Sequence, residues 1–544
     1  MRILIATYWP LPHIGGVSTY IDTLAAGLEG MGHQVEVLGQ LPDLSGYHLR
    51  KSGHAMGKSL LADVTEAEIV RGYKEHGVDI TPWIAWRETE KYFFGYILHH
   101  CALEQYDLIH AQDIVSAFAI ANVKPDSVSL VATIHGCLAT EWTETGEWRF
   151  RTNMEKEYIR LEEYYGSMTP DHLILPSCWL ANRLAAFAVA HPRAEVIAYG
   201  LGEKKHVELM PGEFRAASGT APDSTSGVRQ KTIVCVARLV AVKGHRYLVQ
   251  ALHLMRQRDA EFVCRLAGDG ALRSELEDQV KRLGLQDCVE FLGDVPDVKA
   301  VLATADVVVL PSLQDNLPFA VMEAQALGKP VVASAVGGIV EMSQDGIDGF
   351  LVPSRDVEQL SAHLSLLLQD EDLRRRMSVR AAQKATERWD ARTMLTRTVR
   401  VYEEAVRTAR AQEDRAKAKA GAKAKTGVEA SVPPVPAPEF AASLKQSCPA
   451  SGAPDDPIPV LETVSGCVRA AVTQQTVGDA SVHLLDVTGI VLRSVGTDEH
   501  GNFAIGDVPA GTYTLACFSR AHGSRTQKIS VPQAADSPFA VLLA

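Results

Sequence analysis

Short apolar runs alternate with segments of helical period along most of the chain. In the first helical segment, residues 18–31, the apolar positions Ile21, Leu24, Ala25 and Leu28 fall on one helix face. The runs between such segments are short and mostly apolar, which is typical of strands buried in a parallel sheet. They lie at residues 2–7, 34–38, 107–111, 129–134, 171–176 and 195–198, and again at 232–237, 265–267, 289–292, 307–310 and 331–333. The pattern predicts two successive α/β units, each with a buried parallel sheet.

Breaks in this pattern divide the chain into domains. Residues 203–230 hold no period and predict an inter-domain linker. Residues 411–459 open with an Ala/Lys tract, continue with a Pro/Ala-rich stretch and predict a second linker. The expected units are therefore a first domain over residues 1–202, a second over 231–388 and a returning helix within 389–410. Residues 41–106 are expected to form helices and loops.

A different pattern begins near residue 460. Short alternating strands follow one another, with Gly and Asp in the turns between them. This spacing predicts a small β-sandwich over residues 460–544.

Composition narrows the class of protein. The 544 residues carry a net charge of −12, which argues against nucleic-acid binding through phosphate neutralisation. The nine cysteines include no pair or cluster at zinc-ligand spacing, so reduced thiols and no metal site are expected. The N-terminal run is too short for a signal peptide and no stretch suits a membrane span, so a cytoplasmic location is expected.

Candidate functional residues follow the predicted strands, where loops at the carboxyl ends of a parallel sheet form a crevice. Gly15-Gly16 precede the first helix, and His135 ends a strand. Arg238 and Lys243 follow the first strand of the second unit and suit a diphosphate, since two fixed cations stabilise its charge. Each feature also has a purely structural reading: a tight turn for the glycines, a core position for the histidine and a solvated face for the cations.

The strongest stretch is Pro311 to Gly338, PSLQDNLPFAVMEAQALGKPVVASAVGG. Asp315 lies just before a predicted helix and Glu323 lies eight residues later, so both can border one crevice. The alternative for Asp315 is a carboxylate that favours the helix N-terminus. The stretch resembles the acidic-x7-acidic signature of retaining glycosyltransferases of family 4 (group 1), with Asp315 in place of the usual first Glu. Tyr199 is a second departure, since the family commonly has Asn there.

This resemblance, which covers roughly residues 1–409, implies a GT-B fold: two Rossmann-like domains facing a cleft. It implies that Arg238 and Lys243 bind the diphosphate of a nucleotide sugar, that Glu323 binds its ribose, and that His135 and Asp315 position the sugar. It also implies that Gly15-Gly16 and Gly337-Gly338 let the backbone approach the substrates. The positions expected at the donor are Gly15, Gly16, Arg238, Lys243, Gly268, Phe291, Asn316, Leu317, Glu323, Gly337 and Gly338.

The C-terminal stretch GTDEHGNFAIGDVPAGTYTL resembles the carboxypeptidase-regulatory-like (transthyretin-like) module at Gly501, Phe503, Gly511 and Tyr513. It carries no catalytic constellation, so a stabilising, glycan-binding or protein-binding role is expected.

The expected function is retaining transfer of a hexose from a nucleotide-diphosphate sugar, UDP- or GDP-linked, to a hydroxyl acceptor on a glycan, lipid or small molecule. No tightly bound cofactor is expected. Two alternatives remain: a synthase or phosphorylase acting on a sugar phosphate, and a non-catalytic glycan-binding scaffold. A third question is whether the basic tract 411–426 binds an anionic membrane surface, which would place the protein at the inner face of the membrane.

Overall fold

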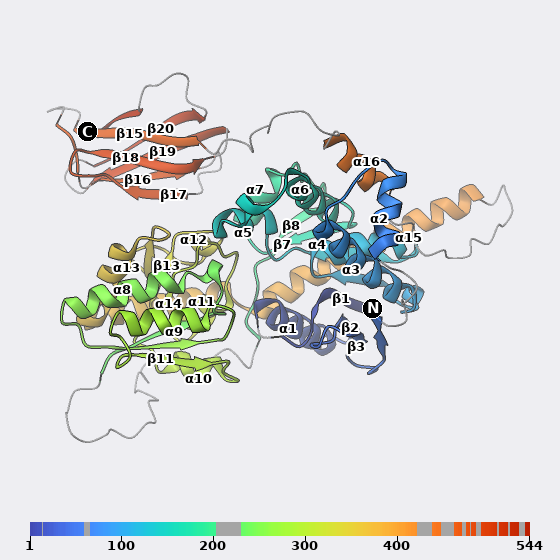
Figure 1. The fold of residues 1–544 in the computed structure, drawn as a ribbon, viewed down its shortest axis with the longest axis horizontal. Helices are drawn as coiled ribbons and strands as arrows, with labels where there is room; N and C mark the ends of the chain where they lie inside the picture. The colour runs from blue at the N-terminus through green and yellow to red at the C-terminus, as the bar shows by residue number, and fades with distance from the viewer. Residues whose placement is uncertain are drawn as a thin grey trace.

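The computed structural model describes residues 1–13, 15–58, 66–202, 230–420, 438–447 and, with short internal gaps, 462–543. Two α/β halves lie side by side, and a β module follows them (Figure 1). The linker predicted at 203–230 falls almost entirely outside the described residues.

The first half is built on an eight-stranded sheet in the order β4-β3-β2-β1-β5-β6-β7-β8. Its six central and distal strands are parallel, while β3 and β4 run antiparallel. The strands are β1 (Arg2–Pro10), β2 (Gln34–Gln40), β3 (Gly46–Leu49), β4 (Ala55–Gly57), β5 (Leu108–Ala111), β6 (Ser129–Thr133), β7 (His172–Leu175) and β8 (Ala194–Val196). The helices are α1 (Gly16–Gly30), α2 (Glu66–Glu75), α3 (Pro82–His99), α4 (Ile114–Val123), α5 (Leu138–Thr145), α6 (Asn153–Met168) and α7 (Cys178–Ala185).

Local sequence explains where these elements begin. The central residues of β1, Ile3 to Ala6, are fully buried, because helices cover both faces of the sheet. Helix α6 starts at a capping box, in which Thr152 and Glu155 each bond the other's backbone N–H. Helix α1 begins at Gly16, two residues before the predicted start, directly at the carboxyl end of β1.

The second half has a six-stranded, fully parallel sheet in the order β11-β10-β9-β12-β13-β14. Its strands are β9 (Thr232–Val236), β10 (Val263–Ala267), β11 (Val289–Gly293), β12 (Val307–Leu310), β13 (Val331–Ser334) and β14 (Gly349–Val352). Its helices are η5 (Ala241–Lys243), α8 (His245–Gln257), α9 (Arg273–Arg282), α10 (Val298–Ala303), α11 (Phe319–Ala326), α12 (Ile339–Met342), α13 (Val357–Gln369) and α14 (Glu371–Arg388). The two α/β units of the prediction are confirmed.

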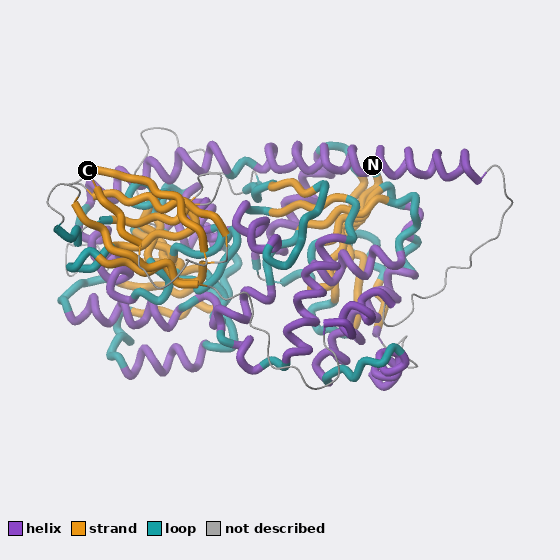
Figure 2. Tube along the Cα trace, turned by 90° about the horizontal axis from the view of Figure 1, so that it is seen from above, coloured by secondary structure: helices purple, strands orange, loops and turns teal. Residues whose placement is uncertain are grey.

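A long helix, α15 (Ala391–Ala420), joins the halves (Figure 2). Trp389, just before it, is buried, and its indole N–H donates to Gln325 Oε1 at 2.7 Å. Further along, Tyr402 is buried against β5, where its hydroxyl bonds His110 Nδ1 at 2.6 Å. One hydrophobic core therefore runs from the second half through α15 into the first. The helix is longer than the predicted 392–409, since the Ala-rich tract continues it.

The bond between His110 and Tyr402 gives a prediction on pH. Burial lowers the pKa of His110 from 6.5 to about 3, so the folded protein excludes a proton that the unfolded chain takes up below pH 6.5. Stability contributed by the neutral ring is therefore present above pH 6.5 and is lost as pH falls toward 3. The wild type should lose up to about 1.4 kcal/mol of unfolding free energy per pH unit relative to His110→Gln between pH 6 and 4. Parallel urea unfolding curves at pH 6, 5 and 4 measure this, and parallel slopes for the two proteins would contradict it.

Two segments differ from the prediction. Residues 41–106 contain the β3–β4 hairpin as well as helices; its strands of four and three residues are too short for an alternating pattern to stand out. Within the predicted linker 411–459, residues Pro438–Ser447 form a helix, α16, that packs on α6. Its side chain Phe440 is buried among the rings of Phe118, Tyr158 and Tyr165. The sequence pattern did not predict this helix, because its short apolar face lies within a low-complexity stretch.

The C-terminal module consists of a three-stranded sheet, β18-β15-β21, and a four-stranded sheet, β17-β16-β19-β20. Its strands are β15 (Glu462–Ala470), β16 (Ser481–Leu485), β17 (Val491–Gly496), β18 (Asn502–Val508), β19 (Gly511–Ser519), β20 (Gly523–Val531) and β21 (Phe539–Leu543). The predicted all-β module is confirmed. The last strand was not predicted; it pairs parallel with β15, the first strand of the module.

Candidate active site

A cavity of about 960 Å³ lies between the two α/β halves. The loops that border it follow β1 and β6 in the first half and β9 and β12 in the second, so it opens at the carboxyl ends of both sheets. Ten residues singled out from the sequence line it: Gly15, Gly16, His135, Arg238, Lys243, Gly268, Asp315, Asn316, Leu317 and Glu323. Phe291, Gly337 and Gly338 do not.

The wall of the second half carries a cation pair and a carboxylate. Lys243 Nζ lies 2.5 Å from Asp315 Oδ2, and both side chains are mostly buried. Ser312 Oγ also donates to Asp315 Oδ2, at 3.1 Å. Arg238, by contrast, is exposed at the cavity. These predicted residues thus border one cavity, and the structure adds that Lys243 and Asp315 bond each other, which the sequence did not reveal.

Glu323 is the fifth residue of α11, little more than one turn from the loop that carries Asp315. Its side chain is half-buried and borders the cavity. The two acidic residues thus face one cavity, as their spacing indicated.

The N-terminus of α1 enters the cavity from the first half. No side chain caps it and its first turn holds no acidic residue. Its unpaired backbone N–H groups favour an anion or hydroxyl oxygens there. Gly16 also allows a close approach between the halves, because an added Cβ would lie 3.3 Å from the ring of Phe319.

His135 is held on both sides of its ring. Nδ1 lies 2.5 Å from the hydroxyl of Tyr199, and Nε2 lies 3.2 Å from Gln112 Oε1. Burial lowers the pKa of His135 to about 3, so the ring is neutral at ordinary pH. An amide oxygen only accepts, so Nε2 carries the proton and Nδ1 accepts from Tyr199. The ring of Tyr199 is stacked on Phe319 of the second half, at 5.2 Å and 6°. The Tyr that departs from the family pattern thus fixes the histidine.

Asn316 bridges the two halves beside the cavity. Its amide nitrogen donates to the carbonyl oxygen of His135 at 3.0 Å, and its Oδ1 accepts from Ser177. Glu341 adds a second bridge, accepting from the backbone N–H groups of Cys178 and Trp179 at the start of α7. The halves are therefore in direct contact, with the cavity lying between them.

Three predicted residues lie behind the cavity wall. Gly337 and Gly338 pack against the loop of Asp315 and Asn316, where a Cβ would come within 1.6 Å and 2.0 Å of the two carbonyl oxygens. This pair therefore holds the loop in place rather than bordering the cavity. Phe291 lies in β11, whereas the cavity is bordered by the turn that follows, residues 294–299.

Several cavity residues were not singled out as site residues from the sequence. They are Trp9, Gln112, Glu141, Tyr199 and Phe319. Tyr199 stood out only as a departure from the family pattern, and Phe319 lies in the signature stretch. Trp9, Gln112 and Glu141 come from β1, the loop after β5 and α5, so only the folded first half brings them together.

The sequence matches three family models. Glycosyltransferase Family 4 covers residues 14–201, glycosyl transferases group 1 covers 221–384, and the carboxypeptidase regulatory-like domain covers 463–544. The chain is a group 1 glycosyltransferase. The two resemblances predicted from the sequence, to glycosyltransferases and to the carboxypeptidase-regulatory-like module, are therefore confirmed. The protein is an enzyme that transfers a sugar.

Relatives align with this glycosyltransferase over its two α/β halves. A glycosyltransferase of Methanocaldococcus jannaschii is 27% identical, over 74% of this chain and 98% of its own. The MMP alpha-(1->4)-mannosyltransferase of Mycolicibacterium hassiacum is 26% identical, over 75% and 98%. The structure of Anabaena HepE in complex with UDP-glucose superposes with a TM-score of 0.53 at 20% identity, over 74% and 100%. The fold is GT-B, as predicted.

Three further expectations concern a membrane span, a metal site and the basic tract 411–426. None of the helices in the described part of the chain combines the length and apolar character of a membrane span. Among the described residues, His, Cys, Asp and Glu side chains form no group able to hold a metal ion. The side chains of most of the basic tract 411–426 lie outside the described residues.

Proposed function

We propose that this glycosyltransferase moves a hexose from a nucleotide-diphosphate sugar to a hydroxyl acceptor, with retention of the anomeric configuration. The observation that carries the proposal is that Arg238 and Lys243 border the same cavity as Glu323 and the uncapped N-terminus of α1. These groups suit a diphosphate, a ribose and a sugar in one continuous site.

In this proposal the cations act on the leaving group. As the bond from the anomeric carbon to the phosphate oxygen breaks, negative charge grows on the diphosphate. Arg238 and Lys243 stabilise that charge without a metal. Lys243 must then exchange some or all of its contact with Asp315 for the phosphate, which leaves Asp315 beside the sugar.

Glu323 receives the ribose hydroxyls, and residues 294–299 border the base. A relative of this fold, Anabaena HepE, has been solved with UDP-glucose, which supports a nucleotide-sugar donor here. We propose a UDP- or GDP-sugar.

The acceptor attacks on the same face from which the diphosphate departs. Its oxygen forms the new bond to the anomeric carbon, and its proton passes to the departing phosphate oxygen. Both atoms and charge balance in this step, so no protein nucleophile is required. The residues of the chain serve to bind, orient and exclude water.

We also propose that His135 positions the donor sugar, and Tyr199 fixes the ring for that role. Tyr199→Phe keeps the stack on Phe319 but removes the hydroxyl that bonds Nδ1. The change should lower kcat about tenfold, the effect of losing one buried hydrogen bond, with KM for the donor changed less. Tyr20→Phe is the matched control, because Tyr20 also packs against the His135 ring but its hydroxyl bonds Thr133 instead. Equal kinetics for the two variants would contradict the role.

We propose that the C-terminal module either stabilises the protein or binds a glycan or another protein.

The test of the proposed function is to incubate the full chain with UDP- and GDP-linked glucose, mannose and N-acetylglucosamine plus simple sugars, and to follow the anomeric proton by NMR. An α-linked product from an α-linked donor supports retention, and an inverted product overturns it. Absence of any nucleotide release with every donor overturns the proposed donor class.

A further inference from the structure

The first half provides one wall of the cavity, opposite the cations of the second. Among the described residues of this wall, the acidic and basic side chains other than histidine are those of Asp22, Arg87, Asp113, Glu141 and Glu163. His13 and His135 also border it, and burial lowers the pKa of both rings, so neither adds a fixed positive charge. Acidic groups therefore outnumber basic ones on this wall.

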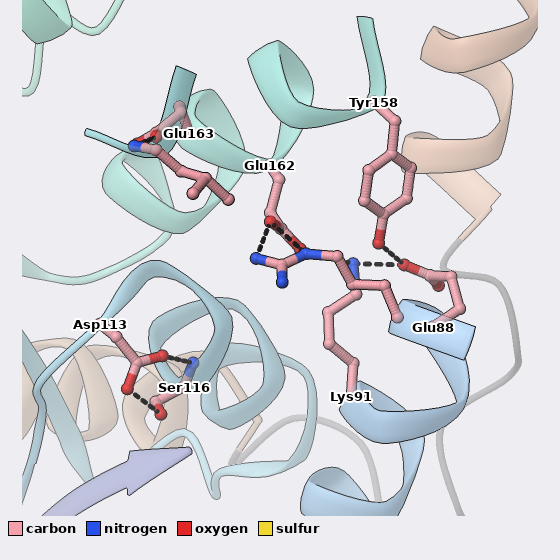
Figure 3. Close-up of polar contacts among 9 residues, drawn as sticks. Glu88, Lys91, Asp113, Ser116, Tyr158, Glu162 and Glu163 are labelled. Carbon is pink, nitrogen blue, oxygen red and sulfur yellow. Dashed lines mark hydrogen bonds and ion pairs between the residues drawn. The ribbon is translucent and has the colours of Figure 1, made fainter. Parts of the chain in front are cut away.

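The basic group on this wall, Arg87, already has an ion-pair partner. Arg87 on α3 bonds Glu162 on α6 through two nitrogens, and burial of the pair leaves both below 9% exposed. Lys91, one turn away, adds a second cation at 3.3 Å from Glu162. Figure 3 shows Lys91, Glu88 and Tyr158 grouped with Glu162 in this buried cluster.

Two of the acidic groups, Asp22 and Asp113, also have partners within the protein. Asp22 on α1 pairs with Arg50 at 2.6 Å. Asp113, the N-cap of α4, accepts hydrogen bonds from the backbone N–H and Oγ of Ser116 (Figure 3). It also accepts from Thr7 Oγ1 and the Tyr8 backbone N–H. These groups hold the wall together and have little capacity left for a ligand.

Glu163 and Glu141 differ from them. Glu163 is fully buried, and its Oε1 accepts the backbone N–H of Leu138 at 2.6 Å, while its Oε2 has no hydrogen-bond partner within the described part of the chain. Burial raises the pKa of Glu163 to about 7. Glu141, half-buried on α5, makes no side-chain hydrogen bond or ion pair within the described residues, and it lies in the field of Lys243 and Arg238. Both carboxyl groups border the cavity with unused hydrogen-bonding capacity.

We propose that Glu141 and Glu163 select an acceptor sugar or cyclitol that carries hydroxyl or ammonium groups and no phosphate. This inference rests on the proposed function, because it assigns the second substrate of the same cavity. Trp9, 46% exposed at the cavity, offers an apolar face to the sugar ring.

The charge balance supports the exclusion of phosphate. A phosphorylated acceptor would bring about two further negative charges next to Glu141 and the donor diphosphate. Arg87, the arginine among the described residues of this wall, is occupied by Glu162, so no free cation of these residues offsets the repulsion. A hydroxyl or ammonium group instead donates to an unused carboxylate oxygen, which removes the cost of leaving it unpaired.

The test uses the full chain saturated with UDP or GDP, whichever of the two binds. Calorimetric titration then compares matched probes: glucose, glucosamine and myo-inositol against glucose 6-phosphate and myo-inositol 1-phosphate. At least one unphosphorylated probe should bind at least tenfold more tightly than its phosphorylated counterpart. Glu141→Lys should reduce or reverse that ratio by at least tenfold. Glu104→Lys, the same charge change at an exposed site outside the cavity, should leave it unchanged.

The outcomes distinguish failure of the acceptor proposal from failure of the proposed donor function. Tighter binding of a phosphorylated probe by the wild type overturns this inference, as does failure of all probes while UDP or GDP still binds. Failure of both UDP and GDP to bind overturns the proposed function instead. Because a lysine can disturb α5, Glu141→Gln provides a second variant; it should weaken glucosamine more than glucose, and an equal loss for both would contradict the role of the charge.

Discussion

Lys243→Ala is expected to lower kcat/KM for the donor about 100- to 1,000-fold, the range for removing one preorganised group at a developing charge. Two effects combine. The diphosphate loses a fixed cation, and Asp315 loses the partner that lies 2.5 Å from it, so a largely buried carboxylate is left to repel the phosphate. Steady-state kinetics with the preferred nucleotide sugar measure this loss. Lys281→Ala, which removes an exposed lysine far from the cavity, is the control.

The double variant Lys243→Ala with Asp315→Asn separates the two effects. If repulsion by Asp315 contributes, the double variant should recover about tenfold over Lys243→Ala, because neighbouring charges couple strongly. An additive loss would mean that Asp315 contacts the sugar independently of Lys243. Activity of Lys243→Ala close to that of the wild type would contradict the assignment of the diphosphate to this loop.

Gly337→Ala is expected to be the most disruptive single methyl addition in the second half. Gly337 has φ 58°, and its Cβ would lie 1.6 Å from the carbonyl oxygen of Asp315. The loop of Asp315 and Asn316 must therefore move, which breaks the bridge from Asn316 to His135. We expect a loss of about 3 kcal/mol or more in unfolding free energy, from strain plus overpacking, and at least about a 100-fold loss of activity in the protein that still folds.

Gly346→Ala isolates the backbone strain. Gly346 has φ 72°, but nothing lies within 4 Å of the position of its Cβ. That variant should lose only about 1 kcal/mol and keep its activity. Urea unfolding and kinetics on both variants distinguish the two causes. Equal losses would show that the contact with the Asp315 loop is unimportant.

Most of the fold could be predicted because its signals are local. Apolar runs such as 307–310 and 331–333 recur between helices, and glycines stand where strands turn toward the cavity. Segments that depend on partners elsewhere in the fold were not predictable. Helix α16 is a short amphipathic stretch whose Phe440 becomes informative only next to Tyr158 and Tyr165. The last strand, Phe539–Leu543, gains its place by pairing with β15 at the far end of the module.

The candidate site shows the same division. Arg238, Lys243, Glu323 and the glycines of α1 follow strands at fixed spacing, so the sequence located them. The bond from Lys243 to Asp315 joins residues 72 apart. Glu141 and Glu163, on the wall of the first half, belong to no motif. Such features depend on side-chain packing between segments far apart in the sequence, which no single stretch encodes. The second glycine pair was assigned to substrate approach, whereas it supports the loop of Asp315.

The central claim is that the cavity binds a nucleotide sugar through Arg238 and Lys243. The most direct measurement is the melting temperature of the full chain with and without UDP, GDP, ADP and their glucose, mannose and N-acetylglucosamine conjugates. A ligand that binds the native state raises the melting temperature by mass action. The account predicts an increase with the UDP or the GDP series, strongly reduced in Arg238→Ala with Lys243→Ala. No increase with any of them, or an increase that survives in the double variant, would contradict it.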